Sequence, residues 1–158
     1  MKWMRLYVPS LIPQKYVEQV KGRDYSVKEF FDFQMINNDN PCNLLFGYID
    51  EDNHVKGYLW AQLNALDGTL FVNTLSVDKE LWGNGDMIDR SIELLDKVQV
   101  KTEAKKVLWC SVNKRFFLKK GFKFSKISLM EYDPSKSKYD SHTKSESHES
   151  EEVKNGTE

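Results

Sequence analysis

The stretch TLFVNTLSVDKELWGNGDMIDRSIELL, residues 69–95, decides the fold. It opens with an alternating apolar run that predicts a strand ending at Val77. Turn residues and a glycine pair, Gly83 and Gly85, follow, and apolar residues then recur at helical spacing from Met87 onward. A helix that begins after such a turn presents free backbone N–H groups and the positive end of its dipole. The pattern therefore predicts an anion site, in which we expect a pyrophosphate.

Strand and helix patterns fill the rest of the chain around this stretch. Ser26 is predicted to cap a helix, because Glu29 three residues later completes a capping box. Asp67-Gly68 is a hairpin signal that leads into the strand at Thr69. The expected order is β-α-α-β-β-β-α-β-α-β, with strands over 2–8, 43–49, 55–63, 69–77, 106–112 and 122–132, and helices over 14–20, 27–36, from about 87, and 114–120.

Composition indicates one globular domain followed by a polar tail. The chain has 158 residues, of which 40% are hydrophobic and 13% aromatic, enough to build a core. Residues 1–132 are the expected domain, whereas residues 133–158 are rich in Ser, Lys and Glu and are expected to be disordered. No run reaches transmembrane length and no apolar leader stands at the N-terminus, so we expect a cytoplasmic protein without a membrane partner.

The cysteines and histidines indicate no metal centre. Cys42 and Cys110 each stand alone in an apolar segment, so we expect two buried free thiols in a reducing compartment. His142 and His148 fall in the predicted tail without ligand spacing, and His54 follows a turn and is expected to face solvent.

The element order and residues 75–95 resemble the GNAT superfamily of acyl-CoA-dependent N-acyltransferases. Lys120-Gly121-Phe122 is similar to that family's Leu-Gly-Phe ending. The resemblance covers residues 2–132 and implies an α+β fold, a central, mostly antiparallel sheet with helices on both faces. It also implies that the strands beginning near Thr69 and Lys106 are adjacent and parallel, and that their C-terminal ends splay apart to receive the cofactor.

The resemblance further implies N-acetyl transfer from acetyl-CoA to an amine that the sequence does not identify. In this family the CoA pyrophosphate lies on the turn before the helix, and a backbone N–H of the fourth strand holds the thioester carbonyl. The cofactor-binding residues that it implies here are Leu75, Ser76, Val77, Trp82, Gly83, Asn84, Gly85, Asp86, Met87, Asn113 and Phe117.

Departures from the family pattern bear on catalysis. Trp82 stands where the family has Arg or Gln, and Met87 stands at a Gly or Ala position, where we expect it to add bulk. An alignment that starts at Glu80 matches both glycines but puts an acid at the Arg or Gln position. Glu80 and Asp86 also bring negative charge toward the expected pyrophosphate. Phe117 replaces a Tyr that protonates the leaving thiolate, and phenylalanine has no proton to donate. We therefore name no catalytic residue.

Two other functions stay open. A GNAT-fold protein without catalysis could serve as an accessory or structural protein, and the resemblance extends to degenerate domains of this kind in small phage proteins, including some carried in the particle. From Lys97 to Lys126 the chain holds ten basic residues against one acid, Glu103. A solvated surface is the favoured interpretation of that run. It would also suit the 3′-phosphate of CoA or non-specific contact with a nucleic-acid backbone.

Truncation after Tyr132 is expected to leave the melting temperature within about five degrees of that of the full chain, because few tail residues can join a core. Thermal unfolding of both proteins, followed by circular dichroism, checks this. A larger fall would mean that the tail docks on the domain.

Overall fold

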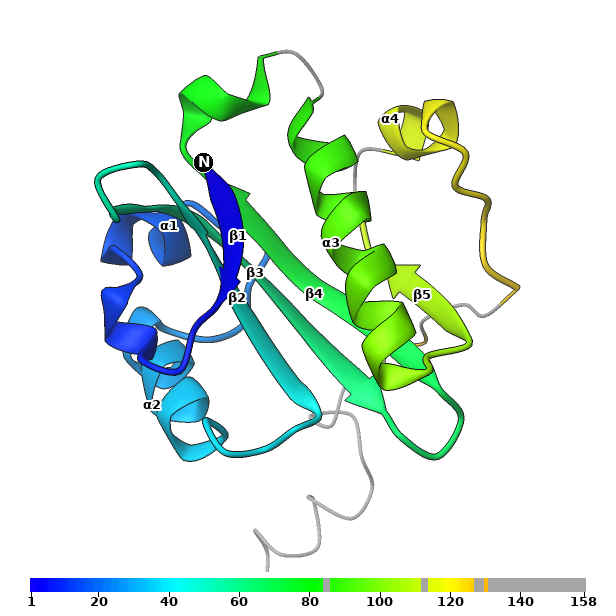
Figure 1. The fold of residues 1–158 in the computed structure, drawn as a ribbon, viewed down its shortest axis with the longest axis horizontal. Helices are drawn as coiled ribbons and strands as arrows, with labels where there is room; N and C mark the ends of the chain where they lie inside the picture. The colour runs from blue at the N-terminus through cyan, green and yellow to red at the C-terminus, as the bar shows by residue number, and fades with distance from the viewer. Residues whose placement is uncertain (84–85, 112–113, 127–129, 131–158) are drawn as a thin grey trace, which may run out of the picture. The chain divides into compact units, whose positions relative to one another are not determined.

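The structure, a computed structural model, describes residues 1–83, 86–111, 114–126 and 130. The chain divides into two units, Met1–Gly121 and Phe122–Glu158. All regular elements that the structure describes lie in the first unit (Figure 1). In chain order they are β1 (Lys2–Arg5), the 3₁₀ turn η1 (Pro9–Leu11), α1 (Gln14–Glu18), α2 (Val27–Ile36), β2 (Asn43–Ile49), β3 (Val55–Asn64), β4 (Thr69–Val77), the 3₁₀ turn η2 (Lys79–Trp82), α3 (Asp86–Thr102), β5 (Lys106–Trp109) and α4 (Lys114–Lys119).

The described strands form one five-stranded sheet in the order β1-β2-β3-β4-β5. The first three neighbouring pairs are antiparallel, and β4 pairs with β5 in parallel. Gly68, with φ of 68°, takes the left-handed conformation that the β3–β4 hairpin requires. The predicted α+β class, with a mostly antiparallel sheet, is confirmed.

One extra residue in β4 shifts its pairing with β3. Trp60 lies opposite Thr74, and the next residue, Ala61, lies opposite Val72. Asn73 therefore has no partner across the ladder and forms a β-bulge. Because side chains alternate along a strand, one inserted residue exchanges the two faces of β4 beyond this point.

The bulge decides which side chains of β4 enter which core. Val72 before the bulge and Val77 after it both pack on the side of the sheet that α3 covers. Ser76 turns to the opposite side, where its hydroxyl donates a hydrogen bond to the carbonyl oxygen of Tyr16 in α1. The C-terminal half of β4 thus has a polar face toward α1 and an apolar face toward α3.

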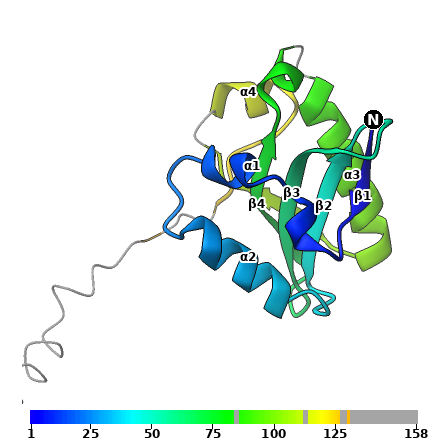
Figure 2. The same ribbon diagram turned by 90° about the vertical axis from the view of Figure 1, so that its left-hand side faces the viewer.

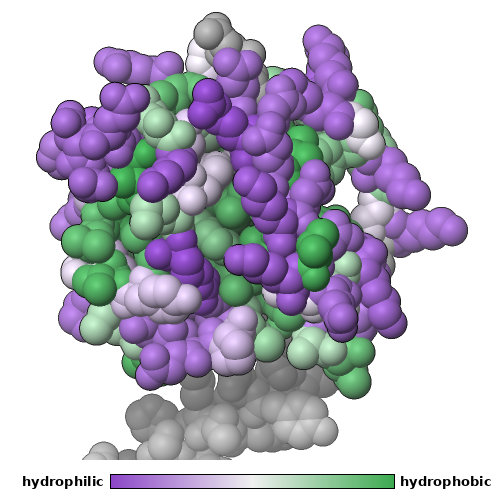
Figure 3. Space-filling model, viewed as in Figure 1, coloured by the Kyte–Doolittle hydropathy of each residue, from purple (hydrophilic) through white to green (hydrophobic). Residues whose placement is uncertain are grey.

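Helices cover both faces of the sheet, as the sequence resemblance implied. Leu94, Leu95 and Val98 of α3 pack on one face, in a stripe at helical spacing. Tyr16 of α1 and Phe30 of α2 pack on the other. Figures 1 and 2 show α3 on one side of the sheet and α1 and α2 on the other. On the α3 side, shown in Figure 3, hydrophilic side chains predominate at the surface, with apolar residues between them.

Local signals explain how α2 is placed. Ser26 accepts a hydrogen bond from the backbone N–H of Glu29, and the Glu29 carboxylate accepts one from the backbone N–H of Ser26, so the predicted capping box is present. A buried polar chain then ties α2 to the sheet. The side-chain amide of Asn43 donates to Gln34, and the indole N–H of Trp60 donates to Asn43.

Two strands are shorter than predicted, and the described residues of a third predicted strand form no strand. β1 ends at Arg5 rather than residue 8, because Leu6 makes one more backbone bond to Leu45 and the chain then turns into η1. β5 ends at Trp109 rather than residue 112. Residues 122–126, predicted to begin the last strand, form no strand. Residues 127–129 and 131–132 of that prediction, and the predicted tail, lie outside the described residues.

The prediction for the cysteines is wrong in burial. Both thiols are free, but Cys42 is only half-buried and Cys110 is exposed. Cys42 stands directly before β2 and Cys110 directly after β5, so both lie at strand ends and not within the strands. None of the described helices is long and apolar enough to cross a membrane.

The end of β4 packs so closely on Gly57 that this position has no room for a side chain. A Cβ at this position would lie 2.4 Å from the side chain of Val77 and 2.6 Å from the Val77 Cα and the Ser76 carbonyl oxygen. Backbone atoms cannot move aside without disturbing the ladder.

Gly57→Ala is therefore expected to destabilise the protein by about 2 kcal/mol, which chemical denaturation measures. Gly83→Ala is the matched control, since its nearest neighbour would be 4.0 Å away. Equal stability of the two variants would contradict this account.

Candidate active site

The β4–β5 ladder ends before β4 does. The last parallel pair joins Val72 to Trp109, whereas β4 continues to Val77. β5 ends at this pair, so beyond it β4 keeps β3 on one edge and has no strand on the other. The prediction that the strands beginning near Thr69 and Lys106 are adjacent and parallel is confirmed, and the ladder ends on the side where we expected them to part.

The pairing register shows which backbone groups of β4 face this opening. The backbone N–H of Asp78 donates to the carbonyl oxygen of Lys56 at 2.8 Å, so this pair is hydrogen-bonded across β3 and β4. In an antiparallel ladder such pairs alternate with pairs whose N–H and C=O groups point outward. Leu75 and Val77 hold the outward positions. Their main-chain groups point to the side where β5 no longer runs.

A cavity of about 690 Å³ occupies this opening. Its lining comes from residues 19–21 after α1, from residues 73–76 of β4, from Lys79 and Trp82 of η2, from Ile88 of α3, from residues 109–111, and from Phe116 and Phe117 of α4. It therefore receives residues from both faces of the sheet. Such a space is within the usual range for small-molecule sites.

Gln19 holds the open end of β4 from the α1 side. Its side-chain N–H₂ donates to the hydroxyl of Ser76 at 2.7 Å and to the carbonyl oxygen of Val77 at 2.8 Å. Ser76 in turn donates to the carbonyl oxygen of Tyr16. The outward carbonyl of Val77 is thus satisfied by α1, whereas the outward groups of Leu75 face the cavity.

Asp78 is the first residue after β4, and residues of α1 hold its side chain in place. Its carboxylate accepts a hydrogen bond from the Tyr16 hydroxyl at 3.1 Å and lies 3.5 Å from the Lys15 ammonium. Desolvation acts to raise the pKa of Asp78, but the Tyr16 hydrogen bond and the Lys15 charge outweigh it and hold that pKa below its ordinary value. The carboxylate is therefore charged at neutral pH.

The glycine turn lies beside the cavity. Trp82, at the end of η2, lines the cavity and is 41% exposed. Gly83 follows with an ordinary φ of −59° and open space around it, so neither packing nor backbone strain requires a glycine there. Asp86 begins α3 and is exposed. Asn84 and Gly85 of the predicted site, and Asn113, lie outside the described residues.

The expectation that Met87 adds bulk at this turn is wrong. Its side chain is only 2% exposed and packs in a core cluster with Tyr48 and Val77. In the first turn of α3 the Met87 side chain faces this core, where burial of a large apolar side chain is stabilising. Only its backbone remains available to the turn.

Aromatic rings form the α4 wall of the cavity. Phe117 packs against Trp109 with ring centroids 4.9 Å apart and planes at 62°. Phe117 lines the cavity, and its phenyl ring cannot donate a proton. Cys110 also lines the cavity. The sequence analysis did not predict this placement, although the position of Cys110 directly after a strand was the available signal.

Among the described lining residues the ionisable side chains are Lys21, Lys79 and Cys110; no Asp, Glu, His or Tyr is present.

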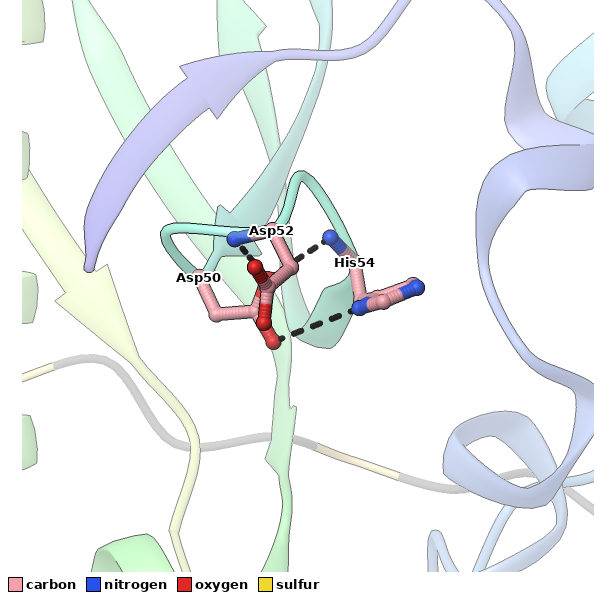
Figure 4. A group of neighbouring side chains, drawn as sticks. All are labelled: Asp50, Asp52 and His54. Carbon is pink, nitrogen blue, oxygen red and sulfur yellow. Dashed lines mark hydrogen bonds and ion pairs between the residues drawn. The ribbon is translucent and has the colours of Figure 1, made fainter.

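A second group of ionisable side chains lies in the β2–β3 turn, at Asp50, Asp52 and His54 (Figure 4). The Asp50 carboxylate accepts hydrogen bonds from the backbone N–H groups of Asp52 and His54, at 3.0 and 2.8 Å. Lys56 adds a cation 3.5 Å away. The backbone bond from His54 is the chief cause that lowers the pKa of Asp50. These contacts explain the group as a hairpin turn, and His54 is exposed as predicted.

The predicted basic run extends over both units. Lys97, Lys101 and Lys119 are exposed in the first unit, whereas Lys123 and Lys126 belong to the second. Lys120 is engaged in an ion pair with Asp89, 2.6 Å away. Contact with a nucleic acid through this run stays an untested prediction.

Comparison with known proteins supports the fold. Neither protein-family models nor curated sequences match this chain. Among solved structures it is similar to a possible acetyltransferase from Clostridium difficile 630, with a TM-score of 0.67 and 10% identity over 84% of this chain and 96% of that one. A predicted acetyltransferase from Clostridium acetobutylicum, solved with acetyl-CoA, gives 0.62 and 10% over 87% and 98%. Glucosamine-6-phosphate N-acetyltransferase from Arabidopsis thaliana gives 0.58 and 20% over 83% and 97%. The chain therefore has the fold of the GNAT acetyltransferases, as its sequence resemblance predicted.

Replacing Met87 tests the corrected role of that residue. Met87→Ala is expected to destabilise the protein by about 2–5 kcal/mol, because it leaves a cavity in the core, while affinity for acetyl-CoA stays unchanged in the folded fraction. Met35→Ala, at a position 59% exposed on α2, is the control and should cost far less. A tighter acetyl-CoA complex of Met87→Ala at unchanged stability would restore the discarded interpretation.

Proposed function

We propose that this protein binds acetyl-CoA in the opening between β4 and β5 and transfers the acetyl group to an amine. The observation that supports this most directly is the unpaired end of β4. Leu75 directs backbone N–H and C=O groups toward a cavity of about 690 Å³, where a ligand with amide groups of its own can pair with them as a strand would. The pantetheine arm of acetyl-CoA carries such amides.

The pyrophosphate would lie at the turn before α3. The backbone N–H groups at the start of that helix, near Trp82, Gly83 and Asp86, suit an anion. Two acids in the first turn oppose it, but Asp89 is paired with Lys120, which offsets one of the two charges. The remaining predicted contacts, Asn84, Gly85, Met87 through its backbone, and Asn113, complete the proposed cofactor site.

The acetyl acceptor would enter from the α1 side of the cavity, where Gln19 and residues 20–21 line it. When bound, acetyl-CoA would supply an activated thioester. Transfer would join the amine nitrogen to the acetyl carbonyl carbon and release CoA as its thiolate, and the amine proton would pass to solvent. An outward N–H of β4, at Leu75 or Val77, can donate to the oxygen that becomes negative.

One observation favours a second function, binding of the cofactor without efficient transfer. Phe117 stands where a proton donor is expected, and the described lining offers no carboxylate or imidazole base. Positioned acids and bases contribute roughly 10²–10⁴-fold to such reactions. A protein that binds acetyl-CoA but acetylates no amine would have this accessory role.

Calorimetric titration with acetyl-CoA tests the proposal. Wild type is expected to bind with a micromolar dissociation constant, and Gly85→Val is expected to abolish binding, because a side chain at the turn blocks approach of the phosphates. Trp82→Arg should tighten binding about tenfold through a charge-assisted contact. Val100→Arg, at an exposed position on α3, carries the same added charge and should change nothing.

Circular dichroism controls for folding in each variant. Absence of saturable binding to the folded wild type would contradict the proposed function, and equal binding by Gly85→Val would refute the proposed phosphate position. A transfer assay on the wild type then separates the enzyme from the accessory role.

A further inference from the structure

We infer, on the premise of the proposed function, that the acetyl acceptor is an amine that also carries a negatively charged group, and that Lys21 binds this group. The inference names the acceptor class, which the fold alone leaves open. It rests on the charge of the cavity lining and on where its two lysines stand.

The described lining of the cavity is positive. Its charged side chains are Lys21 and Lys79, and the described lining holds no carboxylate. Elsewhere in the described chain, Lys15, Lys28, Lys56 and Lys120 are matched by carboxylates within 4 Å. Lys21 is not among these ion-paired lysines. Its charge is therefore available to a ligand.

The two lysines of the lining come from different elements. Lys79 belongs to η2, which leads into the turn proposed for the pyrophosphate. Lys21 follows α1, on the side of Gln19, where the acceptor would enter. Gly22, with φ of 71°, turns the chain immediately after Lys21. We therefore assign Lys21 to the acceptor and Lys79 to the phosphates of the cofactor.

Electrostatics then discriminates between acceptors. A polycationic amine brings a second positive charge toward Lys21 without a carboxylate to receive it, and like charges at close range repel. An amine with a carboxylate or phosphate at its far end meets an opposite charge instead. The same positive environment favours the neutral form of the reacting amine, which suits a site whose described lining contains no carboxylate or imidazole base.

Three probes of equal length separate these cases: 6-aminohexanoate, 1,6-diaminohexane and 1-aminohexane. They share the primary amine and differ in the far end, which is a carboxylate, an ammonium or a methyl group. Binding to the full chain is measured by NMR titration of backbone amides, without cofactor and without turnover. We expect 6-aminohexanoate to bind at least about fivefold more tightly than 1,6-diaminohexane, the scale of a partly exposed ion pair, and to shift the amides near Gln19, Lys21 and Ser76.

Charge reversal tests the assignment to Lys21. Lys21→Glu should invert the preference, so that 1,6-diaminohexane becomes the tighter ligand, and Lys21→Gln should remove it. Lys101→Glu makes the same change in net charge at an exposed position near the end of α3 and should leave the preference of the wild type intact.

Several results would overturn the inference: tighter or equal binding of 1,6-diaminohexane by the wild type, no binding of any probe, or the same inversion in Lys101→Glu. The acetyl-CoA titration is read separately. Loss of acetyl-CoA binding with the expected probe preference would refute the proposed function, whereas acetyl-CoA binding with the opposite probe preference would refute only the acceptor class.

Discussion

The early end of the β4–β5 ladder is the constraint on which the rest of the site depends. Parallel pairing holds β4 as far as Val72, and beyond it one edge of the strand has no neighbour. Buried main-chain groups need hydrogen-bond partners, so a strand that ends in this way inside a domain must be supported by other groups or by a ligand. The structure supplies support for one group and leaves others turned toward a cavity.

That support comes from α1 and β3. Gln19 satisfies the outward carbonyl of Val77, and Ser76 links the same part of β4 to Tyr16. On the other edge, Gly57 lets β3 approach so closely that no side chain fits between the strands. The end of β4 is thus held firmly while its outward face stays open, which is the preorganisation that a binding edge needs.

The described lining of the cavity holds few groups that can transfer a proton. It includes two lysines, a cysteine and the packed rings of Trp109 and Phe117. Such a lining binds and orients better than it transfers protons. The proposed function therefore relies on backbone donors and on an acceptor amine that reaches the site already neutral, and the positive lining favours that state.

Sequence alone determined the elements whose signals are local. The capping box at Ser26, the apolar alternation before Val77 and the helical stripe of α3 depend on neighbours within a few residues, so strands 43–49 and 69–77 and helix 27–36 have the predicted bounds. Tertiary structure decided which way side chains point and where pairing stops. The bulge at Asn73 exchanges the faces of β4, and α3 turns Met87 into the core. Partners distant in the chain set both features, and local periodicity carries no information about those partners. The exposure of Cys110 and the lack of a strand at residues 122–126 likewise differ from what the local pattern predicted.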